Sequence, residues 1–160
     1  MPPFRFSAQR LLDAPAPLVF HCLADYRAHH RPGGFLPPAF TRLDVLQGGV
    51  GDGTVIRFTV SLAGRATTRT QRVSIPEPGR VLVEQGDGEG SVFTVEPRGV
   101  RTLVRIDTTL QARGVLGLLL PLLGPRLLRP LYADELARLE RHAQAHGPLT
   151  TPQPAPQRTP

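Results

Sequence analysis

The sequence predicts an α+β fold, in which an antiparallel sheet of about seven strands is covered by one long C-terminal helix. Two observations predict it. Between residues 4 and 112, short runs of alternating apolar and polar residues are separated by turns rich in glycine and proline, as in an antiparallel meander. From Arg126 to Ala143, apolar residues recur at steps of three and four, as in an amphipathic helix. That helix is the only element long enough to cover the apolar face of the sheet.

The elements follow one another in a simple order. Phe4 to Leu12 alternate and form the first strand, which a proline-containing break ends. A short helix is expected over 18–23, and a second should start at Asp25 and end at 32–34. Pro130 lies early in the long helix, either in its first turn or at a kink. Six further strands are predicted over residues 41–47, 54–62, 65–75, 81–85, 91–96 and 101–112.

The chain of 160 residues is long enough for one domain. We expect this domain over residues 3–146, and a disordered, proline-rich tail over 147–160. The single cysteine, Cys22, excludes an internal disulfide. The N-terminal segment lacks the apolar core of a secretory signal, so a cytoplasmic location is expected.

Arginine supplies all 19 of the basic side chains, and the formal charge is +6. Lysine and asparagine, which have A/T-rich codons, are both absent. A GC-rich gene therefore explains the arginine content without selection for a polyanion. There is no recognition-helix pattern, zinc-finger spacing or exposed aromatic series, so no nucleic-acid partner is expected.

Several short motifs occur in an order and spacing that resemble a known family. They are Asp13-Ala14-Pro15 leading into Val19-Phe20, Leu23-Ala24-Asp25-Tyr26, the glycine-rich turn 49–54, Pro78 to Leu82, Phe93 to Pro97, and the leucine-rich segment that runs into Tyr132 and Leu136. This set resembles the START-like superfamily, in its polyketide cyclase/dehydrase and lipid-transport (SRPBCC) branch. The resemblance implies a helix-grip fold, with a curved sheet wrapped around the long helix and an apolar cavity between them.

This resemblance favours a binding or carrier protein for a hydrophobic or amphipathic small molecule, such as a lipid, a quinone or a polyketide-like compound, with no cofactor. Arg69 shares a strand face with Thr67 and Gln71 and could orient an anionic head group. The residues predicted to bind the ligand are Phe40, Arg69, Phe93, Val95, Val104, Ile106, Leu116, Leu120 and Leu136.

Two other functions stay open. One is a cyclase or dehydratase-type enzyme that uses the same cavity, for which an acid/base group must face the ligand. Tyr26, His30 and Glu84 are the candidates for that role. The other is an interaction module whose cavity is vestigial.

The segment 115–123 is the most apolar stretch of the chain. It either packs on the sheet or forms a lid that contacts an anionic membrane transiently, with Arg113, Arg126 and Arg129 meeting the head groups. Only twelve uncharged residues lie between Gly114 and Pro125, and about 20 are needed to cross a bilayer.

No metal site is expected. His21, Asp25 and His29 are spaced four apart, which on one continuous helix would place them on a single face. The expected change of helix near Asp25 would break this alignment, and no further ligand is evident. Cys22 is interpreted as a small buried residue.

Overall fold

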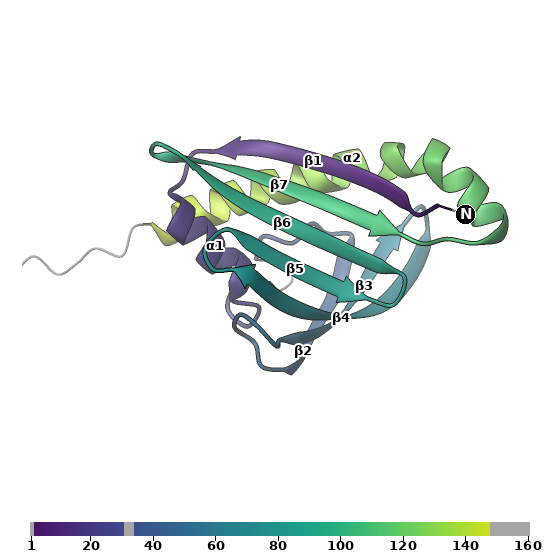
Figure 1. Ribbon diagram of the computed structural model, residues 1–160, viewed down its shortest axis with the longest axis horizontal. Coiled ribbons are helices and arrows are strands. Elements are labelled where there is room, and N and C mark those ends of the chain that lie inside the picture. Colours follow the sequence, from purple (N-terminus) through teal and green to yellow (C-terminus); the bar gives the residue numbers. More distant parts are fainter. Residues whose placement is uncertain (1, 31–33, 148–160) are drawn as a thin grey trace, which may run out of the picture.

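The computed structural model describes residues 2–30 and 34–147. Seven antiparallel strands form one sheet in the spatial order β1-β7-β6-β5-β4-β3-β2 (Figure 1). This confirms the predicted sheet and the helix-grip architecture. The strands are β1 (Phe4–Leu12), β2 (Phe40–Gln47), β3 (Val55–Leu62), β4 (Arg65–Glu77), β5 (Val81–Gly86), β6 (Glu89–Arg98) and β7 (Arg101–Leu110), with the helices α1 (Ala16–Ala24) and α2 (Gly114–His146).

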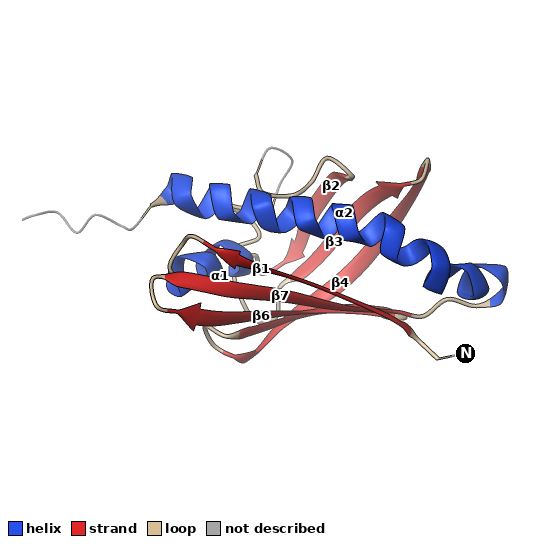
Figure 2. Cartoon of the chain, turned by 90° about the horizontal axis from the view of Figure 1, so that it is seen from above, coloured by secondary structure: helices blue, strands red, loops and turns tan. Residues whose placement is uncertain are grey.

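The long helix α2 lies along one face of the curved sheet, and α1 packs beneath the C-terminal end of α2 (Figure 2). The buried side chains of α2 recur at three- and four-residue steps, which is the spacing that the sequence predicts. They include Leu128, Tyr132, Leu136, Leu139 and Ala143.

The predicted second helix is wrong for the described residues. Residues 25–30 form turns after α1, because the backbone there bonds to a distant glycine-rich loop. Asp25 forms a bridge with Val50, and the Tyr26 N–H donates to the Gly49 carbonyl at 2.8 Å. Residues 31–33, where that helix was expected to end, lie outside the described residues, as does the predicted tail from 148 onward.

The predicted start of the long helix is also wrong. The helix begins at Gly114, not Arg126, and carries Pro121, Pro125 and Pro130 inside it. Prolines inside a helix remove one backbone hydrogen bond each, yet the helix continues through all three. Leucine is a strong helix former, and the segment is rich in it.

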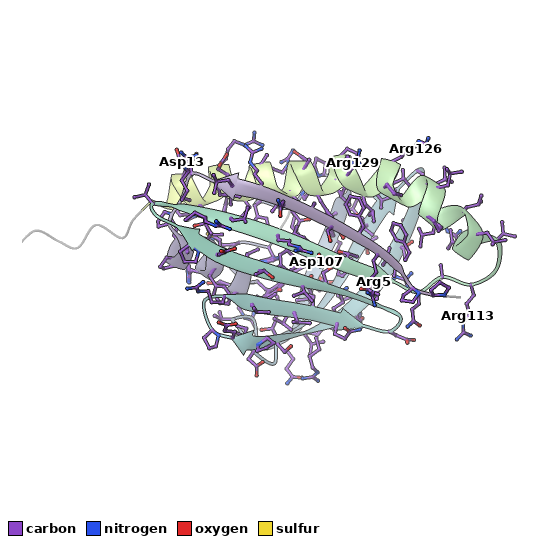
Figure 3. The ribbon with its side chains drawn as sticks, turned by 45° about the horizontal axis from the view of Figure 1, so that its top comes forward. Arg5, Asp13, Asp107, Arg113, Arg126 and Arg129 are labelled. Carbon is purple, nitrogen blue, oxygen red and sulfur yellow. The ribbon has the colours of Figure 1, made fainter. Side chains whose placement is uncertain are left out.

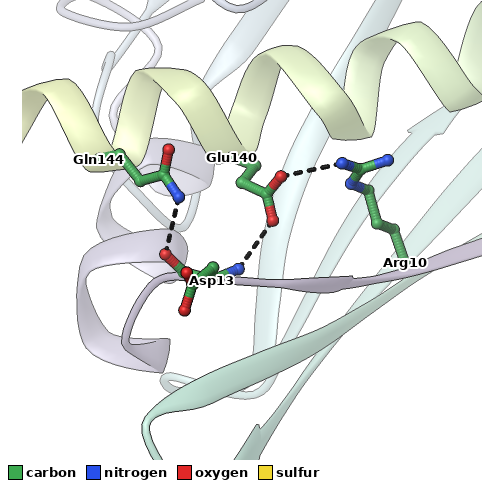
Figure 4. Close-up of polar contacts among 4 residues, drawn as sticks. All are labelled: Arg10, Asp13, Glu140 and Gln144. Atoms are coloured by element: carbon green, nitrogen blue, oxygen red, sulfur yellow. Dashed lines mark hydrogen bonds and ion pairs between the residues drawn. The ribbon is translucent and has the colours of Figure 1, made fainter.

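A polar clamp ties the C-terminal part of α2 to the end of β1 (Figure 4). Arg10 Nη2 donates to Glu140 Oε1 at 2.9 Å, and the Asp13 N–H donates to Glu140 Oε2 at 2.7 Å. Gln144 Nε2 donates to the Asp13 carbonyl at 3.0 Å. These contacts hold the end of β1 against the C-terminal part of α2.

Candidate functional site

A cavity of about 240 Å³ lies between α2 and the sheet. One wall is apolar and comes mainly from β2 and β3, where the alternation of the strands turns every second side chain inward. The other wall, from β4 to β7 and α2, carries carboxyl, amide and hydroxyl groups beside apolar side chains such as Phe93, Ile106 and Leu128. The apolar wall includes Phe40, Leu43, Ile56, Phe58, Val60 and Leu62, and the polar wall includes Gln71, Glu84, Glu89, Ser91, Thr108, Tyr132 and Glu135.

The residues predicted to bind the ligand divide into three groups. Four of them, Phe40, Arg69, Phe93 and Ile106, line the cavity. Val95, Val104 and Leu136 are buried in the core but do not reach the cavity lining. Leu116 and Leu120 lie on α2 outside the lining, with Leu116 59% exposed. The segment 115–123 therefore does not line this cavity.

Glu84 and Tyr26 form a short hydrogen bond at the polar wall. The Tyr26 hydroxyl donates to Glu84 Oε1 at 2.6 Å, and the Tyr26 side chain is buried behind the wall. Burial raises the pKa of Glu84 to about 7, with the Tyr26 hydrogen bond acting against burial and nearby Glu89 adding to it. Burial also raises the pKa of Tyr26 well above its usual range, as do the carboxyls of Glu84 and Glu135. Near neutral pH, Glu84 can therefore both accept and donate a proton, while Tyr26 stays a neutral donor.

His30 lines the cavity but carries no charge near neutral pH. Its Nε2 donates to the Leu23 carbonyl at 2.7 Å, and its ring stacks on Tyr26 with centroids 3.9 Å apart. Burial lowers the pKa of His30 to about 3, against the opposing effect of the Leu23 carbonyl. The neutral ring holds Tyr26 in place and supplies no proton.

Arg69 has a partner inside the domain. Its Nε lies 3.3 Å from Glu89 Oε2, and Gln71 Nε2 donates to Glu89 Oε1 at 3.0 Å. Both oxygens of Glu89 are thus used. The buried carbonyl oxygen of Gln71 has no hydrogen-bond partner among the described residues, which leaves an acceptor on a residue of the cavity wall.

The family model described as "Polyketide cyclase / dehydrase and lipid transport" matches residues 3–144. The chain belongs to this family. No curated protein matches the chain.

Solved structures similar to this polyketide cyclase/dehydrase family member share its fold at low identity. The KanY protein has a TM-score of 0.77 and 24% identity over 90% of this chain and 99% of its own. The Zhui aromatase/cyclase from a Streptomyces species has a TM-score of 0.68 and 16% identity over 93% and 98%. Norcoclaurine synthase from Thalictrum flavum, in complex with dopamine and hydroxybenzaldehyde, has a TM-score of 0.69 and 15% identity over 91% and 89%.

Reading of the sequence missed two further carboxyls in the cavity of this family member, those of Glu89 and Glu135. Glu135 is only 6% exposed and faces the cavity from α2. Burial, followed by the charges of Glu84 and Asp134, raises its pKa to about 8. A signal was present, because Glu135 stands within the apolar stripe of the predicted helix. Beside it, the Tyr132 hydroxyl and Thr108 Oγ1 lie 2.6 Å apart, and Ser91 Oγ lies 2.9 Å from Thr108 Oγ1.

The residues considered for a metal lie outside the cavity. No metal site was expected, because the alignment of His21, Asp25 and His29 should break near Asp25 and because no further ligand was evident. The structure contradicts both of these premises. The His29 N–H donates to the Asp25 carbonyl at 3.1 Å, one turn beyond the bond from Asp25 to His21, so the alignment of the three residues persists. The end of α2 brings His142 to the same place. Burial, with a contribution from Asp25, raises the pKa of Cys22 to about 11, so this thiol is no nucleophile at neutral pH.

Proposed function

We propose that this chain binds a small, neutral, amphipathic molecule of aromatic or polyketide-like type in the cavity. The observation that carries the proposal is the pairing of one apolar wall with another wall that carries protonatable carboxyls. Apolar burial would drive binding, and the polar wall would orient the hydroxyl or carbonyl groups of the ligand.

The size of the cavity supports a ligand of one or two rings over a lipid. Pockets for drug-sized ligands measure about 300–1,000 Å³, and this one measures about 240 Å³. A cavity of this size also favours ligand binding over an interaction module with a vestigial cavity.

The charges of the wall favour a neutral ligand over an anionic one. Among the described residues, Glu84, Glu89 and Glu135 line the cavity together with a single arginine, and Glu89 already pairs with Arg69. An anionic head group would meet carboxyls with no free cation beside them in this part of the lining. The idea that Arg69 orients an anionic ligand is therefore not supported.

The test compares two probes of similar shape, 1-naphthol and 1-naphthoate, by calorimetric titration at pH 7. We expect 1-naphthol to bind more tightly than 1-naphthoate. Val60→Phe places a larger side chain in the cavity and should weaken the binding of 1-naphthol. The matched control is Val100→Phe, because Val100 is 82% exposed in a turn away from the cavity. The proposal would be wrong if 1-naphthoate bound more tightly than 1-naphthol, or if Val60→Phe left the affinity for 1-naphthol unchanged.

A second function, acid–base catalysis on the bound molecule, is supported by Glu84. A carboxylate with a pKa near the working pH can remove a proton from carbon next to a ketone and return it to carbon or to a leaving hydroxyl. The first transfer gives an enolate and a protonated Glu84. Protonation of the leaving hydroxyl gives water and regenerates the carboxylate. Protonated Glu135 would donate a hydrogen bond to the ketone oxygen. These are the proton transfers that a dehydratase requires, and the enolate is also the nucleophile that a cyclase requires.

Exchange of the α-protons of 2-tetralone with deuterated solvent, followed by NMR, tests this function. We expect Glu84→Gln to slow the protein-catalysed exchange by about 100-fold or more, since a positioned base contributes about 10²–10⁴-fold. Glu96→Gln, at an exposed glutamate that pairs with Arg98, should leave exchange unchanged. The rate should rise with pH around 7, because the carboxylate is the active form. Equal exchange rates for wild type and Glu84→Gln would exclude catalysis by Glu84, and ligand binding would then be the only function that the cavity supports.

The N-terminal part of α2 supports a third, independent property, namely contact with an anionic lipid surface. Six leucines and one valine there are 38–73% exposed, and they are Val115, Leu116, Leu118, Leu119, Leu122, Leu123 and Leu127. Arg113, Arg126 and Arg129 flank them (Figure 3), and residues 108–133 contain no acid. Basic side chains beside an apolar helix face are typical of interfacial binding.

A membrane span is less well supported than surface contact. By length and composition α2 could cross a membrane, yet its C-terminal part packs in the core of the domain. Co-sedimentation with vesicles is expected when they contain anionic lipid and should weaken for Leu118→Ser with Leu122→Ser. Val100→Ser is the control, and equal sedimentation of all three proteins would argue against this surface. The cytoplasmic location stays a prediction.

A further inference from the structure

Four of the five histidines of the chain meet where α1 and the turn after it reach the end of α2. The His29 ring lies at the centre, with ring centroids 5.5 Å from His21, 4.8 Å from His142 and 4.9 Å from His146. The fifth, His30, belongs to the cavity wall. They form two pairs, His21 with His29 and His142 with His146, from opposite ends of the sequence, so the fold brings the two pairs together.

Two of these histidines, together with the neighbouring Cys22, have the donor set of a transition-metal site. One donor atom each of Cys22, His29 and His142 lies within 4.8 Å of the others. Tetrahedral zinc donors, with bonds of about 2.0–2.3 Å, lie roughly 3.3–3.8 Å apart, so side-chain adjustments of about 1 Å suffice. Cys22 is fully buried and His29 is 6% exposed. Thiolate and imidazole favour zinc over magnesium or calcium.

The two imidazoles already point at each other. His29 Nδ1 and His142 Nε2 lie 2.7 Å apart, a separation at which one proton bridges two nitrogen lone pairs. A metal ion that takes both lone pairs replaces that proton, which is how metal binding releases protons from ligands.

A second trio shares His29. Donor atoms of His21, Asp25 and His29 also lie within 4.8 Å of one another, but His21 is exposed and Asp25 half-buried. Water and other cations compete for such donors, whereas the Cys22 set is shielded. We propose that Cys22, His29 and His142 bind a zinc-type divalent cation, with water in the fourth position.

Such a cation would join three elements of the domain. Cys22 lies in α1, His29 in the turn that also carries Tyr26 and His30, and His142 in α2. The bound ion would hold this turn, and with it one side of the cavity, against the long helix. The site is separate from the ligand cavity and independent of the function proposed for it.

The experiment uses the full chain, freed of metal by a chelator, and titrates Zn²⁺ against a chromophoric competitor. We expect one Zn²⁺ per chain. His142→Gln should lower the affinity by at least about 100-fold, because even the loss of an outer-shell partner costs 10–100-fold. Arg141→Gln is the control, at an exposed residue of the same helix outside the histidine cluster, and should bind as wild type does. Circular dichroism of each variant checks folding.

Co²⁺ is the second probe, because it reports the ligands directly. Wild type should show the visible bands of tetrahedral Co²⁺ and a thiolate-to-cobalt charge-transfer band, which Cys22→Ser removes. A change at buried Cys22 can also weaken the core. If Cys22→Ser does not fold, the result for His142→Gln tests the proposal instead. Absence of Zn²⁺ binding overturns the proposal. So does loss of binding in Asp25→Asn but not in His142→Gln, because the cation would then sit on the exposed trio.

Discussion

The two parts of α2 show opposite relations between hydropathy and burial. Residues 114–127 carry one charged side chain, Arg126, and yet most of their large apolar side chains are exposed. Residues 128–146 carry six charged side chains, and yet they contribute the buried stripe and a carboxyl that lines the cavity. Hydropathy alone therefore does not tell which part of this helix stabilises the domain. The exposed N-terminal part can contact a lipid surface, whereas the charged C-terminal part packs in the core of the domain.

The largest expected effect separates these two parts by stability. Leu136→Ala should lower the free energy of unfolding by about 2–5 kcal/mol, because it leaves a cavity at a side chain that is 1% exposed. Leu119→Ala is the matched control, since Leu119 is 42% exposed on the same helix, and its effect should stay within about 0.5 kcal/mol. Urea denaturation measures both. Equal losses would show that the N-terminal part is packed in solution.

The next effect sharpens the role of the buried carboxyl. The pKa of Glu135 is about 8 in the folded chain and has an ordinary value of 4.5, so between these values the folded state holds a proton that the unfolded state has released. Stability is therefore complete below about pH 4.5 and is lost as the pH rises toward 8, by at most about 1.4 kcal/mol per pH unit. Glu135→Gln should flatten this slope.

The control for that measurement is Glu96→Gln, at an exposed glutamate of β6, which should keep the wild-type slope. Urea midpoints at pH 5, 6, 7 and 8 suffice for the comparison. A slope that Glu135→Gln leaves unchanged would mean that solvent reaches this carboxyl, and the cavity wall would then not favour a neutral ligand.

Much of the fold could be predicted because its signals are local. Strand alternation placed Ile56, Phe58, Val60 and Leu62 on one face, and all four line the cavity. Turn residues fixed the strand boundaries to within a few positions. The second short helix failed because a bridge to Val50, far along the chain, decides the backbone after α1.

The site was harder to predict, because it depends on contacts between distant segments. Glu84 could be named as an acid/base candidate, but spacing alone could not show that it faces inward. Its raised pKa depends first on burial and then on Tyr26, 58 residues away in sequence, whose hydrogen bond opposes the effect of burial. The period of α2 places Glu135 in the buried stripe without showing that a cavity lies opposite. The histidine cluster depends on where α2 ends relative to α1, and no local pattern predicts that.

The smallest effect compares one polar contact in each part of α2. Glu140 accepts hydrogen bonds from Arg10 and from the Asp13 N–H, whereas Arg126 bonds only the Leu122 carbonyl of its own helix, at 3.2 Å, among the contacts of the described residues. Glu140→Ala should cost about 1–2 kcal/mol, since the clamp combines a surface ion pair with a charged hydrogen bond. Arg126→Ala should cost almost nothing.

The pH dependence identifies the clamp as the cause of the Glu140→Ala loss. Partial burial acts to raise the pKa of Glu140, but the hydrogen bonds from Arg10 and Asp13 outweigh it and lower the pKa below 4.5. A lowered folded pKa stabilises the domain above the unfolded value, and this stabilisation is lost as the pH falls through the folded one. The difference between wild type and Glu140→Ala should therefore shrink as the pH falls below about 4.5. If it stays constant down to pH 3, the loss comes from packing of the side-chain stem and not from the carboxylate.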